Sequence, residues 1–501
     1  MTQLKVILWR EEIGRLVWDP KSHASYFTFN PKLSNRPDIA PLIAPISNNR
    51  DVLPIYSHDR KIYQRLPPFI ADSLPDSWGN KLFEQWAKEN RIQKKDITPL
   101  YKLMFIGKRG MGALEFKPSD DKLNYKGRVN VKDLYDLSLK ILEERAEIVI
   151  PKMDNLTKEA LIAVGTSAGG RQMKAIVAIN KESGEIISGQ IDVPEEFEHY
   201  IIKFEDKFLP TTEIEMAYHD IAVDAGIEME DCFSLNVEGV SHFMTKRFDR
   251  NGNEKIFMQT LAAINPDVDS YEDLINTARR LNLSEKEIIE IFRRLVFNVI
   301  ANNTDDHNKN FSFLLKKGSE WKLSPAYDMT FIFNTSATSG ESVRCLSLYG
   351  KLEDITKQDL IEFARENNVR NPEGIIKNVV EAVENFPEYS NKYHIPERFS
   401  NIIQATISKN LKDLGFKDTS VTNMEFMSDE GVKIQLLMLN LNSRGIYEIH
   451  ANVDGEKKKM YIKPKDEDFY LVQKLDGGLL NDHELRKLLS GIFSTKNWKN
   501  V

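Results

Sequence analysis

Eight polar or charged residues stand in a row from Asn303 to Asn310, between a helical pattern and a strand pattern. The preceding segment, "LSEKEIIEIFRRLVFNVIA", has one apolar stripe at helical spacing, with Ser284 and Glu287 placed as a capping box. The segment that follows, "FSFLL", is typical of a buried strand. A second run, "WKLSPA", returns the chain to Asp328, so the pattern predicts a hairpin that ends beside the polar segment.

Three residues of this region offer oxygen atoms at a spacing typical of phosphoryl transfer. Asp305 precedes Asn310 by five residues, and Asp328 follows Asn310 by eighteen. Carboxylate and amide oxygens are ligands that suit Mg²⁺. In protein kinases one Asp accepts the proton of the attacking hydroxyl, while an Asn and a second Asp hold the metal. The spacing therefore favours these three roles, although a polar loop ahead of a strand also occurs without any function.

A glycine-rich segment and a lysine precede this region. "VGTSAGGRQMKAIVAI" has three glycines within six residues, which favours a phosphate-binding loop over a plain flexible turn only in combination with other features. Lys203 interrupts the apolar strand "YIIKF", and Glu215 follows twelve residues later on a helix predicted to begin near Thr212. A lysine in an apolar strand needs a partner, so a buried Lys203–Glu215 pair and an exposed edge lysine are the two interpretations.

The segment "KRFDR", from Lys246 to Arg250, ends a predicted strand where a mostly helical half begins. In a two-lobed kinase this place is the hinge, whose backbone meets the adenine; a simple exposed strand end is the alternative. These features come in the order found in kinases: the glycine-rich loop, the strand lysine, the helix glutamate, the hinge and the Asp…Asn…Asp set. This shared order favours a phosphotransferase more strongly than any single feature does.

Composition narrows the class of protein. The chain has 501 residues, which predicts several domains, and its 41% hydrophobic and 29% charged residues are typical of a soluble globular protein. It has two cysteines, Cys232 and Cys345, no signal-peptide pattern and no apolar run long enough for a membrane helix, so we expect a cytoplasmic protein without membrane contact. The net charge of −7 indicates that any contact with DNA is indirect or weak.

Over roughly residues 1–415 the chain resembles the HipA family, the serine/threonine kinase toxins of HipBA-type toxin–antitoxin systems. The resemblance rests on "NTDDHNKNFSFLL", "SPAYDM", "GTSAGGRQMKA", "LPDSWG" and "GMGALEF". It implies transfer of the γ-phosphoryl of ATP, with Mg²⁺, to a protein serine or threonine. It also implies a HipB-like, DNA-binding antitoxin and a protein substrate, for which an aminoacyl-tRNA synthetase or another translation factor is a candidate.

The resemblance also implies roles for individual residues. Asp305 would be the catalytic base, Asn310 and Asp328 the metal ligands, Glu215 the partner of Lys203, and Ser167 the serine whose autophosphorylation displaces the loop. Lys246 departs from the family, which usually has an acid there. The residues expected at the nucleotide are Ser167, Ala168, Gly169, Gly170, Arg171, Gln172, Met173, Lys174, Lys203, Lys246, Arg247, Phe248, His307, Asn310, Tyr327 and Asp328.

The predicted fold is α+β: a two-lobed, HipA-like kinase fold with a β-rich N-terminal region, a helical C-lobe and an extra small C-terminal domain. The predicted segments are an N-terminal region (1–125), a kinase N-lobe (126–250), a catalytic C-lobe (251–415) and an appendage of unknown role (416–501). Asp454-Gly455 predicts a hairpin in the appendage.

Two alternatives to a toxin kinase stay open. One is a small-molecule phosphotransferase on the same lobes, against which the N-terminal motifs count. The other is a catalytically silent kinase fold that acts as a co-repressor with a DNA-binding antitoxin. The complete set of Asp305, Asn310, Asp328 and Lys203 counts against the silent form.

Overall fold

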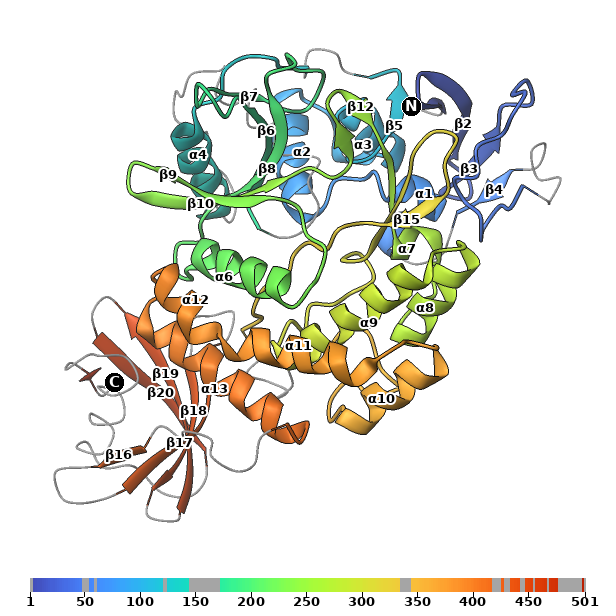
Figure 1. Ribbon diagram of the computed structural model, residues 1–501. Helices are drawn as coiled ribbons and strands as arrows, with labels where there is room; N and C mark the ends of the chain where they lie inside the picture. Colours follow the sequence, from blue (N-terminus) through green and yellow to red (C-terminus); the bar gives the residue numbers. More distant parts are fainter. Residues whose placement is uncertain are drawn as a thin grey trace.

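A computed structural model describes residues 3–46, 54–57, 61–119, 124–143, 172–333 and 344–416, together with six strands beyond residue 416. Helices and strands are both present, and they form the mixed architecture that the sequence predicts (Figure 1). Two five-stranded sheets lie before residue 247, most of the helices lie after residue 260, and the last part of the chain forms a further sheet.

The first sheet is antiparallel, with the strand order β4-β3-β2-β1-β5. Its strands are β1 (Gln3–Leu8), β2 (Glu11–Asp19), β3 (Ala24–Phe29), β4 (Ile55–Tyr56) and β5 (Leu114–Lys117). The opening strand and the strand after the "GKRGMG" turn, both predicted from the sequence, pair with each other at Val6 and Phe116. The first and last strands of the N-terminal region therefore lie side by side in one sheet.

Short helices connect β4 to β5 and cover the next sheet. They are α1 (Pro68–Ala71), α2 (Ser77–Glu89) and α3 (Pro99–Ile106), followed by α4 (Val131–Glu143) after β5. Asp76 caps α2, because its side chain accepts a hydrogen bond from the Gly79 N–H. Trp78 and Leu82 of α2 are buried in the same apolar cluster as Val177 of the second sheet. A helix of the N-terminal region therefore completes the core of the predicted N-lobe.

The second sheet has the order β7-β6-β8-β10-β9 and is antiparallel throughout. Its strands are β6 (Lys174–Ile179), β7 (Ile186–Ser188), β8 (Glu198–Lys203), β9 (Cys232–Val237) and β10 (Val240–Lys246). Helix α6 (Thr211–Asp224) follows β8 and begins within one residue of the predicted start. Because β8 is the central strand, Lys203 is not an edge lysine, and that alternative is wrong.

The third sheet contains the predicted hairpin. Strands β14 (Ser312–Leu315) and β15 (Trp321–Leu323) pair through Phe313 and Leu323, and β13 (Phe257–Thr260) joins on the other side. The expectation of a mostly helical chain directly after Arg250 was incomplete. A small hairpin of β11 (Arg250–Asn251) and β12 (Glu254–Lys255) comes first, because Gly252 adopts the positive φ of 54° that its turn requires.

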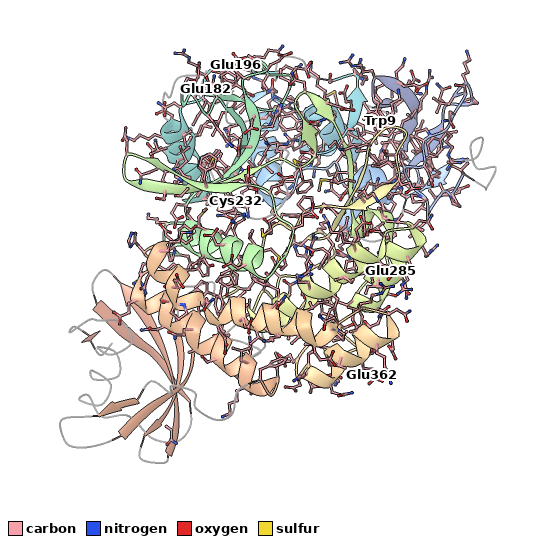
Figure 2. The ribbon with its side chains drawn as sticks, viewed as in Figure 1. Trp9, Glu182, Glu196, Cys232, Glu285 and Glu362 are labelled. Carbon is pink, nitrogen blue, oxygen red and sulfur yellow. The ribbon has the colours of Figure 1, made fainter. Side chains whose placement is uncertain are left out.

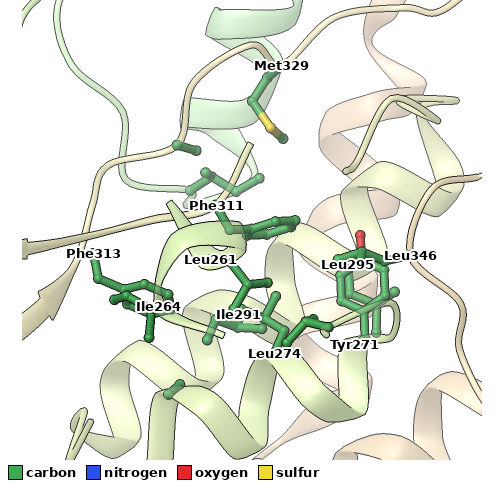
Figure 3. Close-up of a cluster of buried hydrophobic side chains, with 14 of the residues drawn as sticks. Leu261, Ile264, Tyr271, Leu274, Ile291, Leu295, Phe311, Phe313, Met329 and Leu346 are labelled. Atoms are coloured by element: carbon green, nitrogen blue, oxygen red, sulfur yellow. The ribbon is translucent and has the colours of Figure 1, made fainter. Parts of the chain in front are cut away.

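Seven helices of the described chain build the lobe after β13. They are α7 (Leu261–Ile264), α8 (Tyr271–Arg280), α9 (Glu285–Ile300), α10 (Lys357–Glu366), α11 (Pro372–Glu384), α12 (Phe386–Lys392) and α13 (Glu397–Asp413). The capping box of Ser284 and Glu287 at the start of α9 is confirmed. Figure 3 shows the core of this lobe, where Leu261, Tyr271, Leu295 and Phe311 pack together.

Exposed acidic residues lie at the outside of these layers, as Glu182 near β7 and Glu285 at the start of α9 illustrate in Figure 2. None of the helices described is long and apolar enough to cross a membrane.

Beyond residue 416, strands pair in the order β16-β17-β18-β19-β20-β21. They are β16 (Glu425–Met427), β17 (Lys433–Leu441), β18 (Tyr447–Val453), β19 (Glu456–Lys465), β20 (Asp468–Leu475) and β21 (Trp498–Lys499). Val453 pairs with Glu456, so the hairpin predicted at Asp454-Gly455 is confirmed by its flanking strands, although the two turn residues lie outside the described chain.

Candidate active site

Lys203 lies between the carboxylates of Glu215 and Asp328. Its Nζ donates to Glu215 Oε2 at 2.8 Å and to Asp328 Oδ1 at 2.6 Å. The side chains of Lys203 and Glu215 are 8% and 7% exposed, whereas that of Asp328 is 31% exposed. The predicted Lys203–Glu215 pair is therefore present and buried, and Asp328 is the member of the group that solvent or a ligand can reach.

Local structure explains how these three residues meet. Lys203 ends the central strand β8, and Glu215 lies in the first half of α6, which packs against the sheet. Asp328 follows β15 and has a positive φ of 54°, a backbone conformation that costs free energy for a residue other than glycine. The hydrogen bond from the Ala326 N–H to the Glu228 carbonyl, 2.7 Å, holds the segment just before it.

The charges of these neighbouring side chains shift the pKa values of Asp328 and Lys203. Burial alone would raise the pKa of Asp328, but the ammonium groups of Lys203 and Lys174 outweigh it and lower that pKa to about 2. Burial would lower the pKa of Lys203, yet the carboxylates of Asp328 and Glu215 raise it. At neutral pH both Lys203 and Asp328 are charged.

Helix α9 delivers the chain to the polar segment, as predicted. Asn302, with a φ of 58°, turns the chain out of the helix. The Asp305 side chain is 56% exposed, and its Oδ1 lies 3.8 Å from His307 Nε2. The Asn310 side-chain amide donates to the Asp305 carbonyl at 2.7 Å, which brings the predicted base and the predicted metal ligand onto one tight loop.

The neighbouring Asp306 points the opposite way and is buried. Its carboxylate accepts hydrogen bonds from Tyr271 Oη (2.7 Å), Arg344 (3.0 Å) and the Cys345 N–H (2.8 Å). These contacts tie the polar segment to the start of α8 and to the chain at residue 344. Sequence reasoning missed this anchor, and the doubled Asp-Asp was the only signal that could have indicated it.

The oxygen atoms fit a hard cation with few protein ligands. The NH₂ end of the Asn310 amide is bonded to Asp305, so its Oδ1 is the end left for another partner. Asp328 uses Oδ1 for Lys203, and within the described chain its Oδ2 has no hydrogen bond. Within the described ranges, no three His, Cys, Asp or Glu side chains form a metal-binding group. Two oxygen ligands completed by water and phosphate are the usual arrangement for Mg²⁺.

Tyr327 and the hinge segment form a wall beside this group. Tyr327 Oη donates to the Lys309 carbonyl at 2.7 Å, and its ring lies 5.5 Å from that of Phe248. The Arg247 N–H is bonded to the His199 carbonyl at 3.0 Å, whereas the Phe248 N–H has no partner in the described chain. An unpaired backbone amide of this kind is the donor that an adenine ring nitrogen would need.

Two hinge side chains point away from such a ligand. The Arg247 side chain is buried and donates two hydrogen bonds of 2.8 Å to Asp249, so its guanidinium is directed toward Asp249 and not toward such a ligand. Lys246 Nζ donates to Glu198 Oε1 at 2.5 Å. The positive charge that departs from the family pattern is therefore compensated within the sheet.

The segment before β6 is described only in part. Ser167, Ala168, Gly169, Gly170 and Arg171 lie outside the described residues. Gln172 donates to the Phe204 carbonyl at 3.3 Å, and the Met173 side chain is buried in the core of the second sheet. Lys174 pairs with Lys203 across β6 and β8, which places two lysines side by side in the register. Burial lowers the pKa of Lys174, while the nearby carboxylates of Asp328 and Asp76 oppose that shift.

Comparison with known proteins finds matches to two domain models of one protein family. Residues 4–117 match the model of the HipA N-terminal domain, and residues 166–387 match that of the HipA-like C-terminal domain. "Putative kinase Y4mE" of Sinorhizobium fredii is 23% identical over 337 residues, which are 62% of this chain and 76% of that protein. A "Putative kinase" of Haemophilus influenzae is 25% identical over 209 residues, 37% of this chain and 58% of that protein.

A solved structure shares the fold. The Shewanella oneidensis MR-1 complex of the toxin–antitoxin proteins HipA and HipB with operator DNA contains a chain that aligns with a TM-score of 0.54 and 15% identity. The alignment covers 82% of this chain and 96% of that one. The predicted α+β, HipA-like fold is confirmed, and the two domain models together show that this chain belongs to the HipA family.

Proposed function

We propose that this protein is an ATP-dependent serine/threonine kinase and the toxin of a HipBA-like pair. The observation that carries the proposal is the position of Lys203, whose ammonium bridges Glu215 and the partly exposed Asp328 within 3 Å. This is the arrangement by which kinases hold a lysine ready for phosphate and an aspartate ready for a metal. The relatives named as kinases support the same reading.

The residues divide the work of phosphoryl transfer. Lys203 and Lys174 would contact phosphate oxygens, and the Phe248 N–H would bond to the adenine. Asn310 and Asp328 would hold Mg²⁺, which neutralises charge on the phosphates. Asp305 would accept the proton of a serine or threonine hydroxyl as that oxygen bonds to the γ-phosphorus and the bond from the γ-phosphorus to the bridging oxygen breaks. The exposure of Asp305 fits this role, because an incoming protein side chain must reach it.

The partners follow from the family. The Shewanella HipA was solved with HipB and operator DNA, which supports a HipB-like antitoxin as partner of this chain. With a net charge of −7, this chain would meet DNA mainly through that partner. A protein substrate, such as an aminoacyl-tRNA synthetase or another translation factor, remains part of the proposal.

Binding of Mg·ATP, measured by calorimetry, tests the nucleotide site. We expect Asp328→Ala to weaken binding at least tenfold, because it removes a metal ligand and leaves Lys203 with one carboxylate. Asp413→Ala is a matched control on an exposed face of α13 and should bind as the wild type does. Equal affinities of all three proteins, or no binding by the wild type, would overturn the assignment.

A phosphoproteomic comparison distinguishes the remaining functions. Expression of the wild type, but not of an Asp305→Asn variant, should add phosphate to a small set of protein serines or threonines. Phosphate on a small molecule only would indicate a small-molecule phosphotransferase. No transfer at all would indicate a silent co-repressor.

A further inference from the structure

The turn "LPDSWG" of the N-terminal region contacts the nucleotide-binding side of the second sheet. Trp78, in the first turn of α2, is completely buried. Its indole Nε1 donates to the main-chain carbonyl of Lys174 at 3.0 Å. These two residues are 96 positions apart in the sequence, so the contact joins the N-terminal region to the first residue of β6.

Lys174 is the residue through which this contact reaches the site. It is 3% exposed and pairs with Lys203 in the register of β6 and β8. In the described part of the chain, its ammonium has no hydrogen bond or ion pair of its own. A lysine that is mostly buried and whose ammonium has no paired anion is suited to a ligand that supplies the anion, and a triphosphate would do so.

Asp76 fixes the position of Trp78. Its Oδ1 accepts from the Gly79 N–H at 2.6 Å, which starts α2 at Ser77 and places the indole in the first turn. Its other oxygen, Oδ2, is buried without a hydrogen-bond partner in the described chain. The carboxylate also faces the charges of Lys174 and Lys309 from the N-terminal side of the site.

We propose that Trp78 is a positioning residue of the nucleotide site: its indole fixes the backbone of Lys174 and thereby sets where that ammonium meets the phosphates. The inference rests on the proposed function. It gives the N-terminal region a direct part in nucleotide binding, since the second sheet alone leaves the start of β6 without this hydrogen bond.

Trp78→Phe tests the inference, because phenylalanine keeps an aromatic ring in the core but lacks the N–H. A neutral hydrogen bond of this kind corresponds to about a 3- to 10-fold change in an equilibrium. We therefore expect Mg·ATP to bind about 3- to 10-fold more weakly. Trp86→Phe is the matched control, since Trp86 is buried on the same helix but packs against Phe83 and Phe105.

A Lys174→Met background separates positioning from general damage. If Trp78 acts through Lys174, adding Trp78→Phe to Lys174→Met should not weaken Mg·ATP binding further. An equal loss in both backgrounds, or a lowered melting temperature of Trp78→Phe with unchanged Mg·ATP affinity, would overturn the inference. Failure of the wild type to bind Mg·ATP would instead overturn the proposed function.

Discussion

Removal of the Lys203 charge should destabilise the protein far more than removal of a surface lysine. Lys203→Met keeps much of the side-chain length but leaves Glu215 and Asp328 without the ammonium that lies 2.8 and 2.6 Å from them. Breaking a buried ion pair by removing one partner costs about 3–5 kcal/mol. Exposed pairs contribute about 0–1 kcal/mol. We therefore expect a loss of about 3 kcal/mol or more in the free energy of unfolding.

Urea denaturation of four proteins measures this loss: the wild type, Lys203→Met, Glu215→Gln and the double variant. The double variant should lose less than the sum of the single losses, because the neutral glutamine no longer needs a counter-charge. Lys392→Met is the control, since Lys392 pairs with Asp220 at 2.7 Å but is 57% exposed. A loss of stability in Lys203→Met no larger than in this control would refute the reasoning.

Three further predictions concern residues around this group. Burial raises the pKa of Asp76 to about 6, so the ionised carboxylate costs the folded state about 2–3 kcal/mol above that pH. Asp76→Asn should therefore be more stable than the wild type in urea at about pH 7.5. This difference in the free energy of unfolding should shrink toward about pH 4.5. Asp306→Ala leaves Arg344 and Tyr271 without their buried acceptor and should cost about 3–5 kcal/mol, measured by the same denaturation; a change below about 1 kcal/mol would contradict the anchor. Incubation with Mg·ATP should place phosphate on Ser167 at a rate that rises with protein concentration, and the phosphorylated protein should bind ATP more weakly. Phosphosite mapping and calorimetry would check these two results, and phosphate found only on other residues would contradict the role of Ser167.

Parts of the fold could be predicted from local sequence patterns. The capping box at Ser284 and the polar run after α9 depend on neighbours within a few residues, and the structure has both as predicted. The Lys203–Glu215 pair was predictable because a strand lysine and a helix glutamate twelve residues apart have few other ways to satisfy a buried charge.

Contacts between distant segments could not be read from the sequence. The ammonium of Lys203 meets Asp328, 125 positions away, where the segment after β15 pairs with the chain after α6 at Ala326 and Glu228. The contact between Trp78 and Lys174 likewise depends on where α2 packs. Nor does the sequence say which carboxylate of Asp305 and Asp306 faces outward, because two adjacent residues of one type differ only in backbone direction and burial.

Transfer of the radiolabelled γ-phosphoryl group from Mg·ATP to protein tests most directly whether this site is a kinase site. The wild type and Asp305→Asn would each be incubated with Mg·ATP, with the protein itself and a nucleotide-depleted cell extract as acceptors. We expect Asp305→Asn to bind Mg·ATP as the wild type does but to transfer phosphate about 10²- to 10⁴-fold more slowly, the usual contribution of a positioned proton acceptor. Equal transfer by the two proteins would contradict the role of Asp305 as the base.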